Sequence, residues 1–148
     1  MSDVKFELVK AEEQVYELID QYEQFLIPAL RDRGINIKDY AHKLCQYGQT
    51  YSVRLGRKAI GCASIYANDL KKRTGYLSFI AIDPEYRGMG VGKRFLVFLE
   101  NKSRESGMEH LSLEVHTENK NSIAFYRHCG YQPSDNTDAD SFHMVKDL

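Results

Sequence analysis

Residues 76–96 read YLSFIAIDPEYRGMGVGKRFL, and this stretch decides the fold. Its first part is rich in aromatic and β-branched side chains, which is typical of a strand, and Pro84 ends that strand because proline cannot donate to a sheet ladder. Three glycines, Gly88, Gly90 and Gly92, then alternate between basic residues, and an apolar run follows. The stretch therefore predicts a strand, a glycine-rich turn and a helix that includes the glycines.

The rest of the chain shows the same two periodicities on either side of this stretch. Apolar residues at helical spacing predict helices over residues 12–26, 35–48, 87–107 and 121–130. Strand-like runs cover residues 4–11, 50–56, 58–67, 76–83, 110–115, 131–134 and 141–148. Short turns join the central strands, and strand–helix–strand units need a parallel pairing. We therefore expect an α/β (α+β) fold over one domain, residues 1–148, with a mixed, mostly antiparallel sheet flanked by helices.

The bulk properties exclude several classes of protein. The 148 residues are 43% hydrophobic with a formal net charge of −1, so no global field draws the chain to nucleic acid or to a membrane surface. The first residues lack the build of a signal peptide, which predicts a cytoplasmic protein. Cys45, Cys62 and Cys129 lie far apart, and the histidines show no zinc-type spacing with them. We therefore expect no disulfide framework and no metal.

The glycines suit an anion site at the start of a helix. A helix N-terminus carries unpaired N–H groups and about half a positive charge, and glycine lets a ligand approach the backbone closely. A Walker loop is excluded, because Arg94 stands where a serine or threonine is needed, and the GxGxG spacing does not fit a dinucleotide fingerprint. Phosphate binding, most simply of a pyrophosphate, remains. The alternative is a strained strand-to-helix turn that merely needs glycine.

Two ordered motifs resemble those of the GNAT superfamily of N-acetyltransferases. Arg87, Gly90 and Gly92 fall on its R/Q-x-x-G-x-G/A core. Downstream, NKNSIAFYRHCGY (residues 119–131) resembles that family's N-x-x-[AS]-I-x-x-Y-x-x-x-G-[FY]. One glycine loop is weak evidence, but the two motifs in the family's order, separated by one helix and one strand, are specific. The predicted elements match the GNAT-like fold over nearly the whole chain.

The resemblance implies an acetyl-CoA-dependent N-acetyltransferase that acylates a primary amine by direct attack in a ternary complex. Acetyl-CoA would place its pyrophosphate on the helix start and its pantetheine arm along the strand before Pro84. An asparagine and a tyrosine of the second motif would complete the site. The cofactor-binding residues it implies are Ile80, Ala81, Ile82, Arg87, Gly88, Met89, Gly90, Val91, Gly92, Lys93, Asn119 and Tyr126. For the isoleucines and Ala81 we expect the backbone alone to bind.

The chemistry needs an acid for the leaving thiolate and a base for the amine. Tyr126 is the candidate acid, since a phenol of pKa about 10 delivers its proton to a thiolate of pKa about 8.5 at a cost of only about 2 kcal/mol. Glu114 is the candidate base: it lies mid-strand between apolar residues, and partial burial there would raise its pKa. His116 and a water relay are alternatives.

The resemblance assigns the acceptor to residues 27–49 and to the loop SDNTDADS (residues 134–141). Asp135, Asp138 and Asp140 in that loop either attract a cationic amine or are simply solvated. A transferase for another acyl-CoA and a non-catalytic acetyl-CoA sensor are the competing functions. The family also includes homodimers, but the sequence identifies no dimer face.

Overall fold

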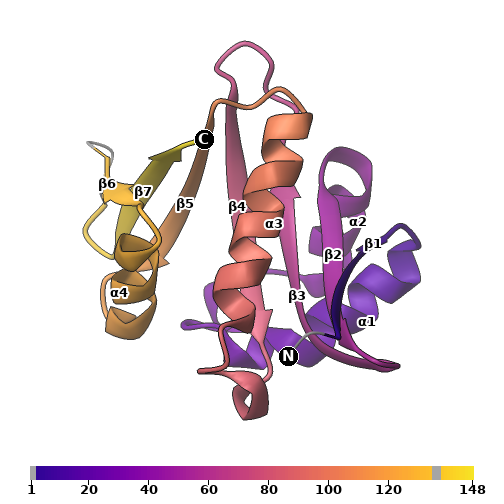
Figure 1. Ribbon diagram of the computed structural model, residues 1–148. Coiled ribbons are helices and arrows are strands. Elements are labelled where there is room, and N and C mark those ends of the chain that lie inside the picture. Colours follow the sequence, from indigo (N-terminus) through magenta and orange to yellow (C-terminus); the bar gives the residue numbers. More distant parts are fainter. Residues whose placement is uncertain (1–2, 135–137) are drawn as a thin grey trace.

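The computed structural model describes residues 3–134 and 138–148 (Figure 1). Its strands are β1 (Val4–Val9), β2 (Gln49–Leu55), β3 (Lys58–Tyr66), β4 (Thr74–Ile82), β5 (His110–His116), β6 (Gln132–Pro133) and β7 (Ser141–Asp147). Its α-helices are α1 (Glu12–Tyr22), α2 (Ile37–Tyr47), α3 (Val91–Glu105) and α4 (Lys120–His128). Short 3₁₀ helices are η1 (Glu23–Phe25), η2 (Arg31–Arg33) and η3 (Pro84–Tyr86). The element order is the one that the sequence predicts.

The described strands form a single sheet in the order β1-β2-β3-β4-β5-β7-β6. β4 and β5 are parallel, and the other neighbouring pairs are antiparallel. The single helix α3 returns the chain to the start of β5, which makes β4 and β5 parallel. Turns join β2, β3 and β4, while α1 and α2 lie between β1 and β2, and α4 and β6 lie between β5 and β7. The expected mixed, mostly antiparallel sheet is confirmed.

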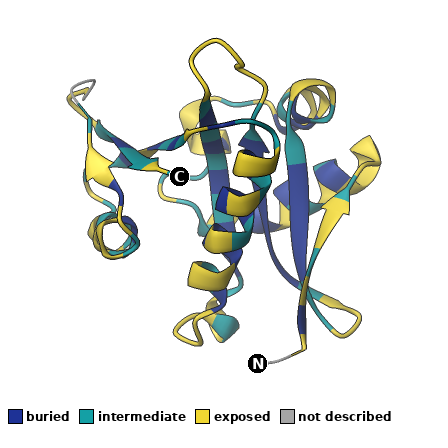
Figure 2. Cartoon of the chain, turned by 45° about the horizontal axis from the view of Figure 1, so that its top comes forward, coloured by how far each residue is buried: buried dark blue, intermediate teal, exposed yellow. Residues whose placement is uncertain are grey.

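Helices cover both faces of the sheet. Figure 1 shows α3 in front of the central strands and α1 with α2 behind them, and Figure 2 shows their buried sides facing the sheet. The core is accordingly split. Leu77 packs with the α3 residues, while Phe79 and Ala81 pack with α1 and α2. Leu77 and Phe79 would share a face in a regular strand, but a bulge opposite Ser64 and Ile65 inserts Ser78 between them.

Two expected helices begin or end elsewhere. The first ends at Tyr22 and gives way to a 3₁₀ turn rather than continuing to residue 26. Pro28 disfavours helical geometry in the residue before it, and the chain is already extended at Leu26. The glycine loop is not helical: α3 begins at Val91, because Gly88 and Gly90 have left-handed backbones, with φ of 81° and 80°.

The ends of α3 and α4 agree with the sequence. Both close with a left-handed glycine, Gly107 and Gly130, in a Schellman arrangement. After α4, the amide of Tyr131 bonds the carbonyl of Tyr126, and the two rings meet edge-on at 5.8 Å between centroids. The second motif thus fixes the two tyrosines against each other.

The three cysteines are free thiols, as expected. Across residues 3–134 and 138–148, no helix has the length and apolar character that crossing a membrane requires.

Candidate active site

β4 and β5 separate halfway along their length. Their pairing runs from Thr74 with His110 to Leu77 with Leu113, and the described register contains no pair beyond that point. The remainder of β4, from Ser78 to Ile82, is held by β3 on its other side. The bulge at Ser78 sits at the place of separation and bends the strand there. One edge of β4 is therefore open inside the sheet.

The alternation of the β3–β4 ladder decides which groups face this opening. The amide of Asp83 donates to the carbonyl of Ile60 at 2.8 Å, so the ladder bonds on β4 belong to every second residue, Asp83 and Ala81. The peptide groups of Ile80 and Ile82 consequently point the other way, toward the open edge. Of the three strand residues predicted to bind a cofactor, Ala81 thus offers its main chain to β3 instead.

The glycine loop lies at the end of this open strand. Side chains at Gly88 or Gly90 would meet no atom within 4 Å, so both positions face open space. Gly92 is helical, and a Cβ there would meet the Phe125 ring of α4 at 3.6 Å. The three glycines therefore differ: Gly88 and Gly90 set the left-handed loop, whereas Gly92 lies in the helix with room for a methyl group beside Phe125.

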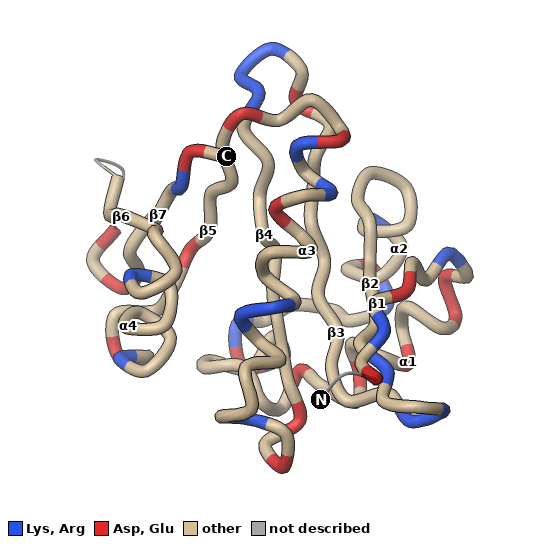
Figure 3. Tube along the Cα trace, in the orientation of Figure 1, with Lys and Arg blue, Asp and Glu red and all other residues tan. Residues whose placement is uncertain are grey.

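The first amides of α3 have no hydrogen-bond partner among residues 3–134 and 138–148. The first bond within the helix joins the amide of Arg94 to the carbonyl of Gly90 at 3.1 Å, which leaves the amides of Val91, Gly92 and Lys93 before it. Gly90 has no side chain to cap them. α1 and α2 carry acidic residues in their first turns, whereas α3 carries none and has Lys93 and Arg94 nearby (Figure 3). This charge pattern leaves the helix dipole uncompensated and favours an anion.

The other loop residues have distinct placements. Arg87 turns back, so that its Nε donates to the carbonyl of Ile82 at 3.1 Å and its guanidinium lies 5.9 Å from the centre of the Phe25 ring. Its side chain therefore ties the loop to the end of β4. Met89 is exposed and Val91 is buried in the core, so a role of Val91 in binding is limited to its main chain.

Asn119 caps the helix that carries the second motif. It is the N-cap of α4, and its side-chain oxygen accepts from the amide of Ser122 at 3.3 Å. Capping accounts for the oxygen, and the amide nitrogen of Asn119 is left for another partner.

Tyr126 lies on the buried side of α4. It is 8% exposed and packs edge-on against Phe125 and Tyr131. Burial raises the pKa of Tyr126 above the ordinary phenol value, and Cys129 and Tyr76 raise it further. The group therefore stays protonated through neutral pH.

Glu114 is not buried as the sequence suggests. It is exposed on β5, and its Oε1 lies 2.8 Å from Nε2 of His143 on β7. The reason is that β4, which would cover it, has already separated from β5. His116 stabilises the turn after β5, because its Nδ1 accepts a hydrogen bond from the amide of Glu118 at 3.2 Å. The structure thus brings Glu114 together with His143 and not with His116.

Tyrosines line the sheet face next to Glu114. The hydroxyl of Tyr40 on α2 bonds that of Ser78 at the bulge, which places part of residues 27–49 against the separation point. Burial raises the pKa of Tyr40 to about 12, although the hydrogen bond to Ser78 lowers it. Burial also raises the pKa of Tyr76, with the Glu114 carboxylate acting in the same direction and Arg33 against it.

The aspartate loop is described only in part. Asp135 lies outside the described residues. Asp138 and Asp140 are exposed, and the carbonyl of Asp140 accepts from the amide of Thr117 at 2.9 Å, close to the end of β5.

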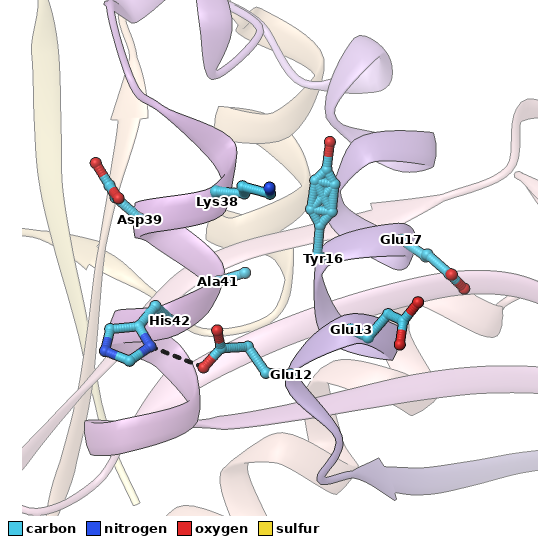
Figure 4. Close-up of a pocket in the computed structure, with 8 residues that line it drawn as sticks. All are labelled: Glu12, Glu13, Tyr16, Glu17, Lys38, Asp39, Ala41 and His42. Atoms are coloured by element: carbon cyan, nitrogen blue, oxygen red, sulfur yellow. Dashed lines mark hydrogen bonds and ion pairs between the residues drawn. The ribbon is translucent and has the colours of Figure 1, made fainter.

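A surface groove between α1 and α2 is a separate feature (Figure 4). Four acidic residues line it together with Lys38 and His42, and His42 bonds Glu12 at 2.8 Å. None of the predicted catalytic or cofactor-binding residues lies in this groove, although its α2 side belongs to residues 27–49, to which the resemblance assigns the acceptor.

Comparison with known proteins decides the family. Residues 12–131 match the Acetyltransferase (GNAT) family. The chain belongs to this family. The match spans both motifs, and it confirms the GNAT resemblance.

Relatives and solved structures agree with the GNAT assignment. The chain is 34% identical over 76 residues to thialysine N-epsilon-acetyltransferase of Bos taurus, covering 51% of the chain and 44% of that protein. It is 27% identical over 118 residues to IAA acetyltransferase of Azospirillum brasilense, covering 80% and 74%. A GNAT acetyltransferase of Elizabethkingia anophelis with acetyl-CoA bound has the same fold, with a TM-score of 0.79, 15% identity and full coverage of both chains.

The relatives differ from this GNAT chain in length. The chain spans less than half of the bovine protein, and 14% of an uncharacterized protein of Mycobacterium leprae with which it shares 45% identity over 53 residues.

Sequence reasoning did not single out two groups of residues that the structure places beside the predicted site residues. His143 was hidden because its pairing with Glu114 depends on the register of β5 against β7, which nothing local in the sequence encodes. Tyr40 and Ser78 meet only through the packing of α2 on β4. One signal in the sequence could have indicated the bulge at Ser78: Leu77 and Phe79 are two residues apart, yet they pack on opposite faces of the sheet.

Proposed function

We propose that this chain is an acetyl-CoA-dependent N-acetyltransferase that acylates a primary amine by direct attack in a ternary complex. One observation carries the proposal. The edge of β4 opens at the same end of the sheet at which α3 begins with three unused amides and no acidic residue. An extended ligand with two amides and a pyrophosphate fits these two features in sequence.

The cofactor would lie along β4 and end on α3. The pantetheine amides would bond the main-chain groups of Ile80 and Ile82, and the pyrophosphate would meet the amides of Val91, Gly92 and Lys93. Arg87 contributes through its bonds to the end of β4 rather than as a free cation. The side-chain nitrogen of Asn119 is a further donor for the cofactor.

Acyl transfer then follows from the placement of three groups. The amide of Ile80 would polarise the thioester carbonyl, and the neutral amine would attack its carbon. As the C–S bond breaks, the hydroxyl of Tyr126 would protonate the departing sulfur. The raised pKa of Tyr126 makes this transfer more costly than the ~2 kcal/mol between ordinary phenol and thiol values. The same burial also disfavours a free thiolate, and that offsets the added cost.

Glu114 would accept the proton that the amine loses, directly or through one water. It is exposed on the face lined by Tyr76, at the point where β4 leaves β5. The acceptor would approach from the α2 side, over Tyr40 and Ser78, with the loop holding Asp138 and Asp140 at the far edge.

An amine screen tests this function. The protein is incubated with acetyl-CoA and a library of amines, and thiol release is followed together with the mass of the product. Deprotonating an α-amine at pH 7 costs about 1 kcal/mol and a lysine-like amine about 4.6 kcal/mol, so the screen is run at pH 7 and at pH 9. Acetylated amine supports the proposal. Tight acetyl-CoA binding without product would indicate a sensor, and turnover with a longer acyl-CoA alone would indicate a different transferase.

Tyr126→Phe tests the acid. We expect kcat to fall by a factor of about 10² or more while the affinity for CoA changes little. Unchanged kcat would remove Tyr126 from the chemistry.

A further inference from the structure

Glu114 and His143 form a cross-strand pair on the outer part of the sheet. β5 and β7 are antiparallel, and Glu114 stands directly opposite His143 in their register. Their side chains point to the same face, and Nε2 of His143 lies 2.8 Å from Oε1 of Glu114. The strand register therefore fixes this contact, which is not a chance approach of two long side chains.

Two other pairs of histidine with a carboxylate occur in the described residues, and they are more exposed. His42 and Glu12 have side chains 56% and 52% exposed, and His110 and Asp147 have 41% and 90%. His143 and Glu114 have 29% and 35%. Solvent therefore screens the contact of this third pair least. It is also the pair that lies beside the separation of β4 and β5.

The separation of the strands explains why Glu114 needs a partner. Beyond Leu113, β5 has β7 on one side and no paired strand on the other. A glutamate side chain has three rotatable bonds, and without a neighbour it samples many rotamers. A donor on β7 holds one carboxylate oxygen and leaves the second oxygen for the acceptor.

We propose that His143 is a positioning residue for Glu114 in the acyl transfer. Nε2 of His143, 2.8 Å from Oε1 of Glu114, holds that oxygen and orients the carboxylate, so that Oε2 takes the proton of the acceptor amine. His143 itself touches neither the acceptor nor the cofactor. The inference rests on the proposed function, because it needs Glu114 to act as the base.

The experiment is a double-mutant cycle with a conservative rescue. The variants are His143→Ala, His143→Gln, Glu114→Gln and the double variant of His143→Ala with Glu114→Gln. For each, kcat and KM are measured with an amine that the wild type acetylates, and the affinity for CoA is measured by calorimetry. Glutamine retains a donor near the position of Nε2.

We expect His143→Ala to lower kcat about tenfold at unchanged CoA affinity, and His143→Gln to recover most of that loss. The double variant should be no slower than Glu114→Gln alone, since both changes remove one function. His110→Ala is the matched control. It breaks the equivalent pair with Asp147 on the same two strands and should leave kcat unchanged.

Three results with an active wild type would overturn the inference while the proposed function stands. The first is a double variant in which the losses of kcat from His143→Ala and Glu114→Gln multiply. The others are a His143→Gln variant as slow as His143→Ala, and a His110→Ala variant whose kcat falls as much as that of His143→Ala. Absence of acetylation by the wild type with any amine would overturn the proposed function, and the inference with it.

Discussion

A single methyl group at Gly90 tests the anion site most directly. Gly90 has φ of 80° and ψ of 3°, and an L-residue in this left-handed geometry costs about 1–2 kcal/mol. No atom lies within 4 Å of the added methyl, so the empty loop is free to relax and avoid the strain. Binding would then have to restore the strained conformation. We therefore expect Gly90→Ala to weaken CoA binding about 5- to 30-fold, with little change in the free energy of unfolding.

Gly92→Ala is the matched control. The residue is helical, and the new methyl would meet Phe125 at 3.6 Å, an ordinary van der Waals contact. Alanine is also favoured over glycine in a helix by about 0.5–1 kcal/mol. We expect this variant to be at least as stable as the wild type and to bind CoA within a few-fold of it.

Calorimetric titration with CoA, alongside urea unfolding of both variants, measures the two terms separately. Wild-type affinity in Gly90→Ala would refute the argument that the left-handed loop forms the phosphate site. An equal loss in both variants would show that added bulk, and not backbone geometry, controls binding.

Three further predictions concern the residues around the site. Asn119→Asp should keep the α4 cap and the stability but weaken CoA binding, because the amide donor is lost, whereas Asn119→Ala should also cost about 1 kcal/mol in urea unfolding. The pKa of Tyr40 is raised to about 12 in the folded protein, so the stability that its protonated hydroxyl contributes is complete below pH 10 and is lost as the pH rises to 12. Between neutral pH and pH 11, the wild type should therefore lose about 1.4 kcal/mol of unfolding free energy that the Tyr40→Phe variant does not lose. Lys146 bonds the buried Glu100 at 3.1 Å, and Lys146→Met should destabilise the fold by about 3 kcal/mol, measured in urea; a loss below 1 kcal/mol would show that Glu100 is solvated.

The order of elements and the position of the left-handed glycine loop could be predicted from sequence because their signals are local. Helical and strand periodicity depend on neighbouring residues, and so does the left-handed geometry that Gly88 and Gly90 permit. Helix ends marked by glycine, at Gly107 and Gly130, were also predictable. The start of α3 was predicted at residue 87 instead of Val91, because glycine occurs both in the first turn of a helix and in the loop before it.

What remained hidden depends on contacts between distant segments. Glu114 looks buried in the sequence because it stands between Leu113 and Val115, and it is exposed because β4 leaves β5 just before it. Ala81 looks equivalent to its neighbours, yet the β3 ladder uses its peptide groups.

The sequence by itself determined the family and the glycine-rich turn before α3, since turns of this kind are encoded where they occur. Only the tertiary structure decided that Glu114 is exposed beside the separation of β4 and β5 and that His143 contacts it. The register between β5 and β7 is set by the packing of whole strands, and no local pattern records that Glu114 and His143 stand opposite each other.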